Sequence, residues 1–162
     1  MITITSLLPT LVFIAAIGSG LVAGIFFSFS NFVISALNRL QPRQSIAAMQ
    51  AINVAVLNPL FFSVFFGTGA VCLLVIMLSL LSWSPPSAIF LIIGSLLYLV
   101  GTVLVTMRRN VPLNKVLANL SIGSTEDVEH WDNYYIKWTY WNHVRTVAAL
   151  MAAIMLTTRL CT

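Results

Sequence analysis

Between Arg43 and Arg108 the chain contains no Asp, Glu, Lys, Arg or His. A helix that crosses the hydrocarbon core of a bilayer needs about 20 apolar residues, so this stretch is long enough for two crossings and the turn between them. A soluble domain needs a polar surface to face water, and an uncharged stretch of this length would contribute almost nothing to one. The stretch therefore predicts an integral membrane protein.

The composition of the whole chain agrees with this prediction. Of the 162 residues, 59% are hydrophobic and 7% are charged, which lies outside the range of soluble domains. Four crossings with short connections account for this length. We therefore expect an all-α fold, a bundle of four transmembrane helices in a single membrane domain over residues 1–162.

Four apolar segments are expected to cross the membrane. They are residues 7–37, 58–81, 88–107 and 138–158. The less apolar residues 44–57 predict a short interfacial helix before the second crossing, which starts at Asn58-Pro59 because proline suits the first turn of a helix. A turn is expected at 83–87, where two prolines follow a tryptophan. The last helix is expected to start at Ser124 or Thr125, of which Thr125 is a good cap, and to extend beyond the membrane.

Small residues predict where the helices approach one another. Gly18, Gly20 and Gly24 form a stripe on the first crossing, and Gly94 and Gly101 are two turns apart on the third. Such stripes allow close packing of neighbouring helices. They also agree with association into a homo-oligomer or a larger membrane complex.

The basic residues predict the orientation in the membrane. Seven of the eight fall in the two connections on one side, namely Arg39, Arg43, Arg108, Arg109, Lys115, Lys137 and Arg145. By the positive-inside rule this side, with the connection 108–137, faces the cytoplasm, and both termini lie outside. In a bacterium the membrane would be the plasma (inner) membrane. Nucleic acid is not an expected partner, because the basic residues do not cluster on one solvated face; anionic lipid head groups are.

One face of the last helix carries the densest set of functional side chains. At 100° per residue, five side chains fall within this narrow face, namely Trp131, Tyr135, Trp138, Asn142 and Arg145, and Tyr134 lies at its margin. A flat aromatic ligand could stack there while Arg145 balances a negative charge. The alternative is an interfacial aromatic belt with Arg145 reaching toward the head groups. The position of Asn142 beside Arg145 near the membrane boundary favours a site, because polar groups at that depth need partners.

Further amide side chains are expected on the same side of the membrane. They are Gln50, Asn53, Asn58, Asn110 and Asn114. Because amides both donate and accept hydrogen bonds, several of them around a partly desolvated pocket could bind a carbonyl or phenol of a lipophilic small molecule. Each alone is also a common cap or turn residue. No metal site is expected, since no His-x3-His or His-x2-Glu pair occurs.

Several motifs occur in a characteristic order along the chain. They are Met49-Gln50 with Asn53, Asn58-Pro59-Leu60-Phe61, Asn110-Val111-Pro112-Leu113-Asn114, Trp131, and Trp138-Thr139-Tyr140-Trp141-Asn142-His143-Val144-Arg145-Thr146. In these motifs the chain resembles the anthrone oxygenase-like family of small four-helix membrane proteins, many of which are catalogued only as a domain of unknown function.

The resemblance implies an oxidoreductase that uses dioxygen without a cofactor on a lipophilic aromatic or quinone-like molecule, in a pocket at the cytoplasmic end of the bundle. An anthrone that enolises to its phenolate is electron-rich enough to give an electron to dioxygen directly. By motif, the resemblance assigns pocket walls to Trp131, Trp138 and Trp141, anion stabilisation to Arg145, orientation of oxygens to Asn110, Asn114 and Asn142, and the role of base to His143. The alternative is a non-catalytic membrane subunit that binds a lipid or a larger membrane complex.

Overall fold

The computed structural model describes residues 4–82, 87–121, 123 and 127–158, with side chains from residue 7 onward. Within these ranges every regular element is a helix and no strand occurs, which confirms the all-α prediction. The turn predicted at 83–87 falls almost entirely outside the described residues, and the cap predicted at Thr125 lies outside them.

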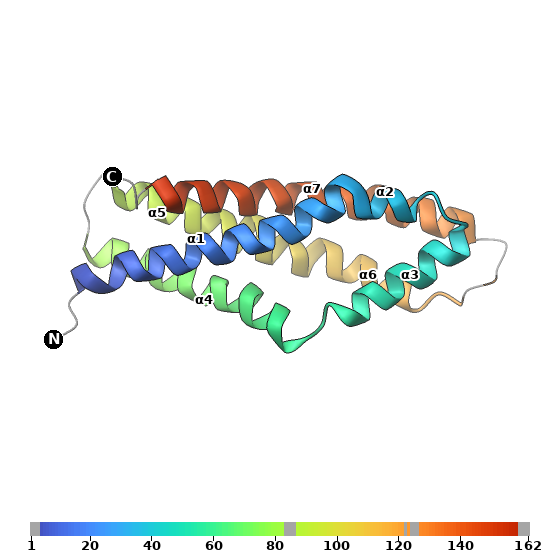
Figure 1. The fold of residues 1–162 in the computed structure, drawn as a ribbon, viewed down its shortest axis with the longest axis horizontal. Helices are drawn as coiled ribbons and strands as arrows, with labels where there is room; N and C mark the ends of the chain where they lie inside the picture. Colours follow the sequence, from blue (N-terminus) through green and yellow to red (C-terminus); the bar gives the residue numbers. More distant parts are fainter. Residues whose placement is uncertain (1–3, 83–86, 122, 124–126, 159–162) are drawn as a thin grey trace.

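The described residues pass four times along one long axis (Figure 1). The first pass comprises α1 (Ile4–Ser28), the π-helix η1 (Phe29–Val33) and α2 (Ile34–Leu37). The second is α3 (Pro42–Ala55) followed by α4 (Pro59–Leu81). The third comprises α5 (Ser87–Leu96), the π-helices η2 (Leu97–Leu104) and η3 (Thr106–Asn110), and α6 (Val111–Ala118). The fourth is the single helix α7 (Asp127–Thr158). The described chain starts and ends at one end of the bundle, while α2, α3 and α6 lie toward the other.

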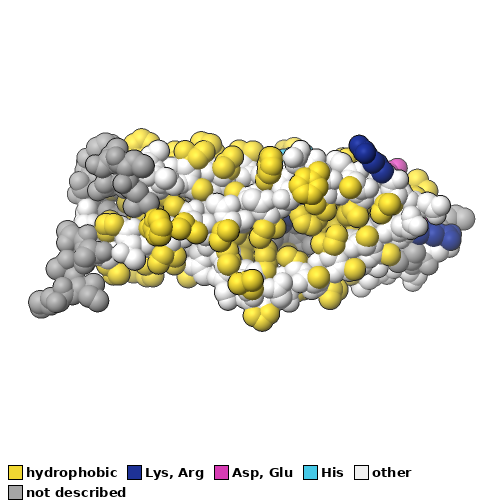
Figure 2. All heavy atoms as spheres, in the orientation of Figure 1, with side chains coloured by type: hydrophobic (Ala, Val, Ile, Leu, Met, Phe, Trp, Pro, Cys, Tyr) yellow, Lys and Arg dark blue, Asp and Glu magenta, His cyan; other side chains and the backbone are white. Residues whose placement is uncertain are grey.

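Three helical stretches are long and apolar enough to cross a membrane, by length and composition: Leu7–Leu37, Pro59–Leu81 and Ser87–Ala118. The third continues beyond residue 107, where the sequence predicted its end. Pro112 does not interrupt it: Asn110 and Val111, the two residues before it, keep helical backbone angles, so η3 and α6 form one continuous helix. Figure 2 shows apolar side chains over most of the visible surface and charged ones toward the end opposite the termini. An apolar surface of this extent fits an integral membrane protein.

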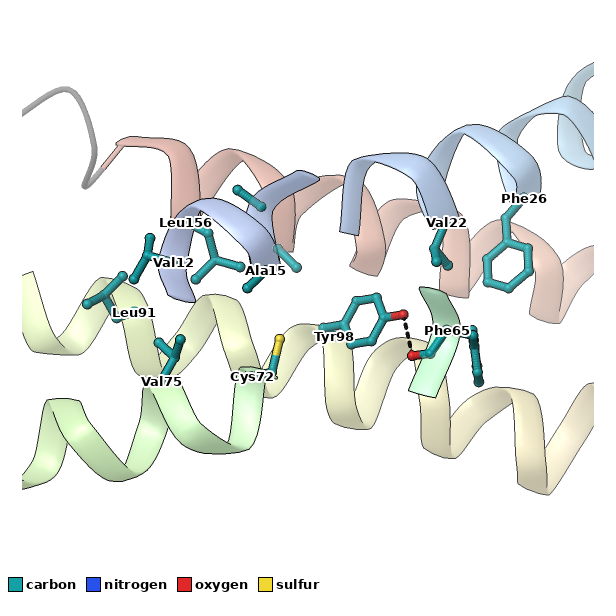
Figure 3. Close-up of a cluster of buried hydrophobic side chains, with 12 residues drawn as sticks. Val12, Ala15, Val22, Phe26, Phe65, Cys72, Val75, Leu91, Tyr98 and Leu156 are labelled. Atoms are coloured by element: carbon teal, nitrogen blue, oxygen red, sulfur yellow. Dashed lines mark hydrogen bonds between the residues drawn. The ribbon is translucent and has the colours of Figure 1, made fainter. Parts of the chain in front are cut away.

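Two clusters of buried side chains hold the bundle together. The first lies between α1, α4, α5, η2 and α7 and contains Tyr98, whose hydroxyl donates to the Phe65 carbonyl at 2.9 Å (Figure 3). The second lies toward the end opposite the termini and is built from Ile34, Ile46, Met49, Leu117, Trp131, Tyr134 and Trp138. Because this second cluster contains most of the buried aromatic residues of α7, it forms the base of the site described below.

Glycines allow two of the helix contacts. A Cβ added at Gly101 would lie 2.5 Å from Ala148 Cβ, and one added at Gly94 would lie 3.1 Å from Met155 Cβ, so the third pass and α7 meet at the predicted glycines. On α1 the close contact is made by Gly18 against Thr68. A Cβ added at Gly20 or Gly24 would meet no atom within 4 Å, so among the described residues no other helix packs closely against them.

The second pass is bent at residues 56–58. Asn58 Oδ1 accepts a hydrogen bond from Phe61 N at 3.0 Å, and Asn58 Nδ2 donates to the Ala55 carbonyl at 3.0 Å. Asn58 is thus the N-cap of α4, and Pro59 occupies its first turn. The bend turns α3 and α4 away from each other, and a hollow lies on each side of it.

Candidate functional site

The site is centred on Arg145, which is 6% exposed in the middle of α7. Its Nε donates to Asn142 Oδ1 at 3.0 Å, and one terminal nitrogen donates to Thr106 Oγ1 at 3.4 Å. Its guanidinium carbon lies 4.0 Å from the ring centre of Phe26 and 5.0 Å from that of Trp138. Within the described ranges, no Asp or Glu forms an ion pair with it. A buried charge without a counter-ion is costly, so an anion bound here would be strongly stabilised.

Asn142 fixes the orientation of Arg145. It is fully buried, and its Nδ2 donates to the Phe26 carbonyl at 2.8 Å and to Ser30 Oγ at 2.6 Å. Ser30 Oγ also forms a hydrogen bond with Thr146 Oγ1 at 3.1 Å. Because the amide nitrogen is held by the first pass of the bundle, its oxygen is left to accept from Arg145.

The helices around Arg145 are wound as π-helices at this level. Ser30 belongs to η1 and Thr106 to η3. Thr102 in η2 donates from Oγ1 to the Arg145 carbonyl at 3.4 Å. Single π-helical turns inside α-helices are frequent at functional sites, because they redirect side chains that a regular helix would aim elsewhere.

Two buried polar atoms at Trp138 and at its neighbour Asn110 have no hydrogen-bond partner among the described residues. Asn110 is fully buried and donates from Nδ2 to the Trp138 carbonyl at 3.2 Å, but its Oδ1 accepts nothing from the described residues. The Nε1 of Trp138 is likewise buried and donates to none of them. Since buried polar atoms are nearly always paired, an unpaired acceptor and an unpaired donor indicate a place for a ligand with a hydroxyl or carbonyl group.

A hollow of about 810 Å³ lies between α3 and α6. Gln50, Asn53 and Asn114 line it together with apolar residues such as Val54 and Val111, so three predicted amides meet here. Gln50 Nε2 donates to the Leu117 carbonyl at 2.8 Å, whereas Asn53 Nδ2 has no partner among the described residues. Figure 2 shows the surface hollowed beside the α3–α4 bend. The volume is within the range of sites for small organic ligands.

Tyr134 and Trp138 lie between this hollow and Arg145. The Tyr134 hydroxyl donates to Asn114 Oδ1 at 2.9 Å, and its ring centre is 6.2 Å from that of Trp138. Burial raises the pKa of this hydroxyl above its ordinary value, while the Asn53 side chain and the charge of Arg145 act in the opposite direction. Tyr134 is therefore close to groups of the hollow and within electrostatic reach of Arg145.

Four of the predicted residues have other surroundings. Asn58 is the exposed cap of α4 and borders a second hollow. His143 is exposed, although Asn142 and Arg145 on the same helix are buried. Trp141 is half-buried under Arg109, whose guanidinium carbon lies 4.6 Å from its ring centre. Tyr135 is half-buried and packs against the edge of the second cluster. The structure does not place these four with Arg145.

Trp131 packs with Tyr134 and Trp138 in the second cluster but is not among the residues that contact Arg145. It is buried, its ring centre lies 5.8 Å from that of Tyr134, and its Nε1 donates to Asn38 Oδ1 at 2.8 Å.

Across the described ranges, no three His, Cys, Asp or Glu side chains lie close enough together to bind a metal ion.

Four residues of the site were absent from the sequence-based selection: Phe26, Ser30, Thr106 and Tyr134. Ser30 and Thr106 stand in apolar segments, where a hydroxyl most often bonds back to its own helix, so neither gave a signal. Tyr134 was at the margin of the predicted face, and its neighbour Trp138 four residues on could have pointed to it.

A family model described as anthrone oxygenase matches residues 60–155. The match extends from α4 into α7 and contains Asn110, Asn114, Trp138, Asn142 and Arg145. No curated protein and no solved structure matches the chain. Because the matched residues make up more than half of its length and the motifs occur in the expected order, the chain belongs to the anthrone oxygenase family.

Proposed function

We propose that this protein is a membrane oxidoreductase that uses dioxygen to oxidise a lipophilic aromatic molecule of the anthrone or hydroquinone type. Family membership and the three apolar helical stretches support it. The observation that carries it is the buried Arg145, which has aromatic rings on two sides and no acidic partner among the described residues. An anion of a flat aromatic molecule satisfies the charge and the rings together.

The chemistry needs an electron-rich anion. An anthrone loses a proton from its central methylene carbon, and the anion transfers an electron to dioxygen to give a carbon radical and superoxide. These combine to a peroxide anion at that carbon, which takes up the proton lost in the first step; the resulting hydroperoxide loses water and leaves the second carbonyl. Overall, anthrone and dioxygen give anthraquinone and water. A fixed positive charge lowers the barrier because it stabilises the anion that must form first.

In this proposal the flat body of the substrate lies in the hollow between α3 and α6, where Gln50, Asn53 and Asn114 bind its oxygens. Its anionic edge is directed toward Tyr134, Trp138 and Arg145. Reaching Arg145 requires the Tyr134 and Trp138 rings to move, which rotamer changes on binding commonly allow. The site as proposed uses no cofactor.

We further propose how the chain is placed in the membrane. The apolar second half of α7, residues 138–158, forms a fourth crossing, and α3 lies at the interface. The end with α2, α3 and α6 faces the cytoplasm and both termini lie outside; in a bacterium the membrane is the plasma (inner) membrane. The positive-inside distribution supports this orientation.

The test is the oxidation of anthrone by the protein purified in detergent, followed as dioxygen uptake and as anthraquinone absorbance. We expect a rate above that of the spontaneous reaction, a large loss in Arg145→Gln, and none in Lys137→Gln, which removes an exposed cation from the same helix. A wild-type rate equal to the spontaneous rate, for anthrone and for simple hydroquinones, would exclude the proposal.

A second candidate is a non-catalytic membrane subunit that binds a lipid or a larger membrane complex. The observation that favours it is the open space at Gly20 and Gly24, where a helix of another chain could approach closely. Co-purification with one partner at fixed stoichiometry, lost in Gly20→Leu, would support this candidate.

A further inference from the structure

The second hollow, on the other side of the α3–α4 bend, has no role in the proposal above. It has a volume of about 430 Å³ and is lined by Leu21 and Ile25 of α1 and by Leu60, Phe61 and Val64 of α4. Asn58 is its only polar lining side chain among the described residues, and that side chain is engaged as the cap of α4. Both helices belong to stretches that are apolar enough to cross a membrane. In the membrane placement proposed above, the hollow opens toward hydrocarbon rather than water.

An aromatic layer leads from this second hollow to Arg145. Phe61 lines the hollow and stacks on Phe65, with ring centres 5.5 Å apart. Phe65 meets Phe26 edge to face at 6.3 Å, and Phe26 lies against the Arg145 guanidinium at 4.0 Å. Figure 3 shows Phe26 and Phe65 facing one another from α1 and α4. Every ring in this sequence of contacts belongs to a phenylalanine.

We infer that dioxygen reaches the neighbourhood of Arg145 through this second hollow and its phenylalanine layer, while the aromatic substrate occupies the hollow between α3 and α6. The inference rests on the proposed function, which requires two reactants of different polarity. Dioxygen is small and apolar and dissolves more readily in hydrocarbon than in water, so an apolar opening to the bilayer suits it. The hollow lined by amides suits a molecule that carries oxygens.

Dioxygen access can be measured without turnover. In a background where the other three tryptophans are phenylalanine, only Trp138 fluoresces, and dioxygen quenches it on collision. We expect Ile25→Phe and, independently, Val64→Phe to lower the quenching rate constant by about threefold, because filling the hollow leaves no void for a small molecule. Ile17→Phe makes the same exchange at an exposed position of α1 outside the hollow and should change nothing. Melting temperatures of all variants report folding.

A kinetic arm separates this inference from the proposed function. If the protein oxidises anthrone, Ile25→Phe should raise the KM for dioxygen and leave the KM for anthrone unchanged. If the protein oxidises nothing, the proposed function fails and the quenching experiment alone decides the route. The inference is overturned if quenching is unchanged in both hollow-filling variants, if Ile17→Phe lowers it equally, or if the KM for anthrone rises in place of that for dioxygen.

Discussion

Replacing Arg145 by methionine should separate function from stability. Methionine keeps an unbranched side chain of similar length and can fill the space between Phe26 and Trp138, but it removes the charge. If Arg145 serves only the fold, its replacement should lower the free energy of unfolding. If Arg145 serves to bind an anion, its replacement should lower the rate of substrate oxidation and leave the stability nearly unchanged.

The expected change in stability follows from the contacts of the guanidinium. The guanidinium donates two hydrogen bonds; the one to Asn142 at 3.0 Å contributes roughly 1.5–3 kcal/mol, and the longer one to Thr106 at 3.4 Å contributes less. Two cation–π contacts, at 4.0 and 5.0 Å, contribute about 0.5–2 kcal/mol each. The desolvation of a buried ion opposes them by several kcal/mol. These contributions nearly cancel, so the free energy of unfolding should change by less than about 2 kcal/mol, or the Tm by less than about 6 °C.

The effect on oxidation should be far larger. Removing one group that stabilises a developing negative charge typically lowers the rate by about 100- to 1,000-fold. The assay pairs thermal unfolding in detergent, followed by fluorescence, with anthrone oxidation. Lys137→Met, at an exposed position of the same helix, is the matched control and should change neither. A loss of more than about 3 kcal/mol in Arg145→Met, the size expected when a buried ion pair is broken, would refute the reasoning.

Three further variants test the packing, the cap and the exposed histidine. Gly101→Ala should lower the stability by about 1–3 kcal/mol, because its Cβ would lie 2.5 Å from that of Ala148, whereas Gly20→Ala, with open space around it, should be neutral in a melting experiment. Asn58→Ala should cost about 1 kcal/mol through the lost cap of α4, seen as a lower Tm, and should leave the KM for anthrone unchanged. His143→Gln should keep the oxidation rate, because His143 is exposed and outside the Arg145 cluster; a loss comparable to that of Arg145→Met would instead assign His143 the role of base.

The sequence predicted well what depends on local periodicity. The apolar segments are helices, and the inward face of α7 is correct for Trp131, Trp138, Asn142 and Arg145, which are all buried. Helical spacing alone determines which side chains share a face, so this result needs no knowledge of the neighbours.

The partners of that face could not be read from the sequence. Asn142 bonds to Phe26 and Ser30, more than 110 residues away, and no periodicity reports which helix lies opposite. The sequence also could not show that the predicted amides have different surroundings. Asn110 donates to the Trp138 carbonyl and Asn114 accepts from the Tyr134 hydroxyl one turn away, so one amide is buried against α7 and the other lines the hollow.

The π-helical segments of the third pass also change the direction in which the side chains after them point. A π-helical turn closes its hydrogen bond around one more residue than an α-helical turn. Each such turn therefore shifts the angular position of everything that follows, and η2 and η3 both precede α6. The apolar face of α5 and the polar face of α6 consequently both meet α7, although they would not be aligned on one uninterrupted α-helix. Loss of a single residue from η2 or η3 would remove one of these shifts, turn α6 by about 100° relative to α5, and rotate Asn114 away from Tyr134.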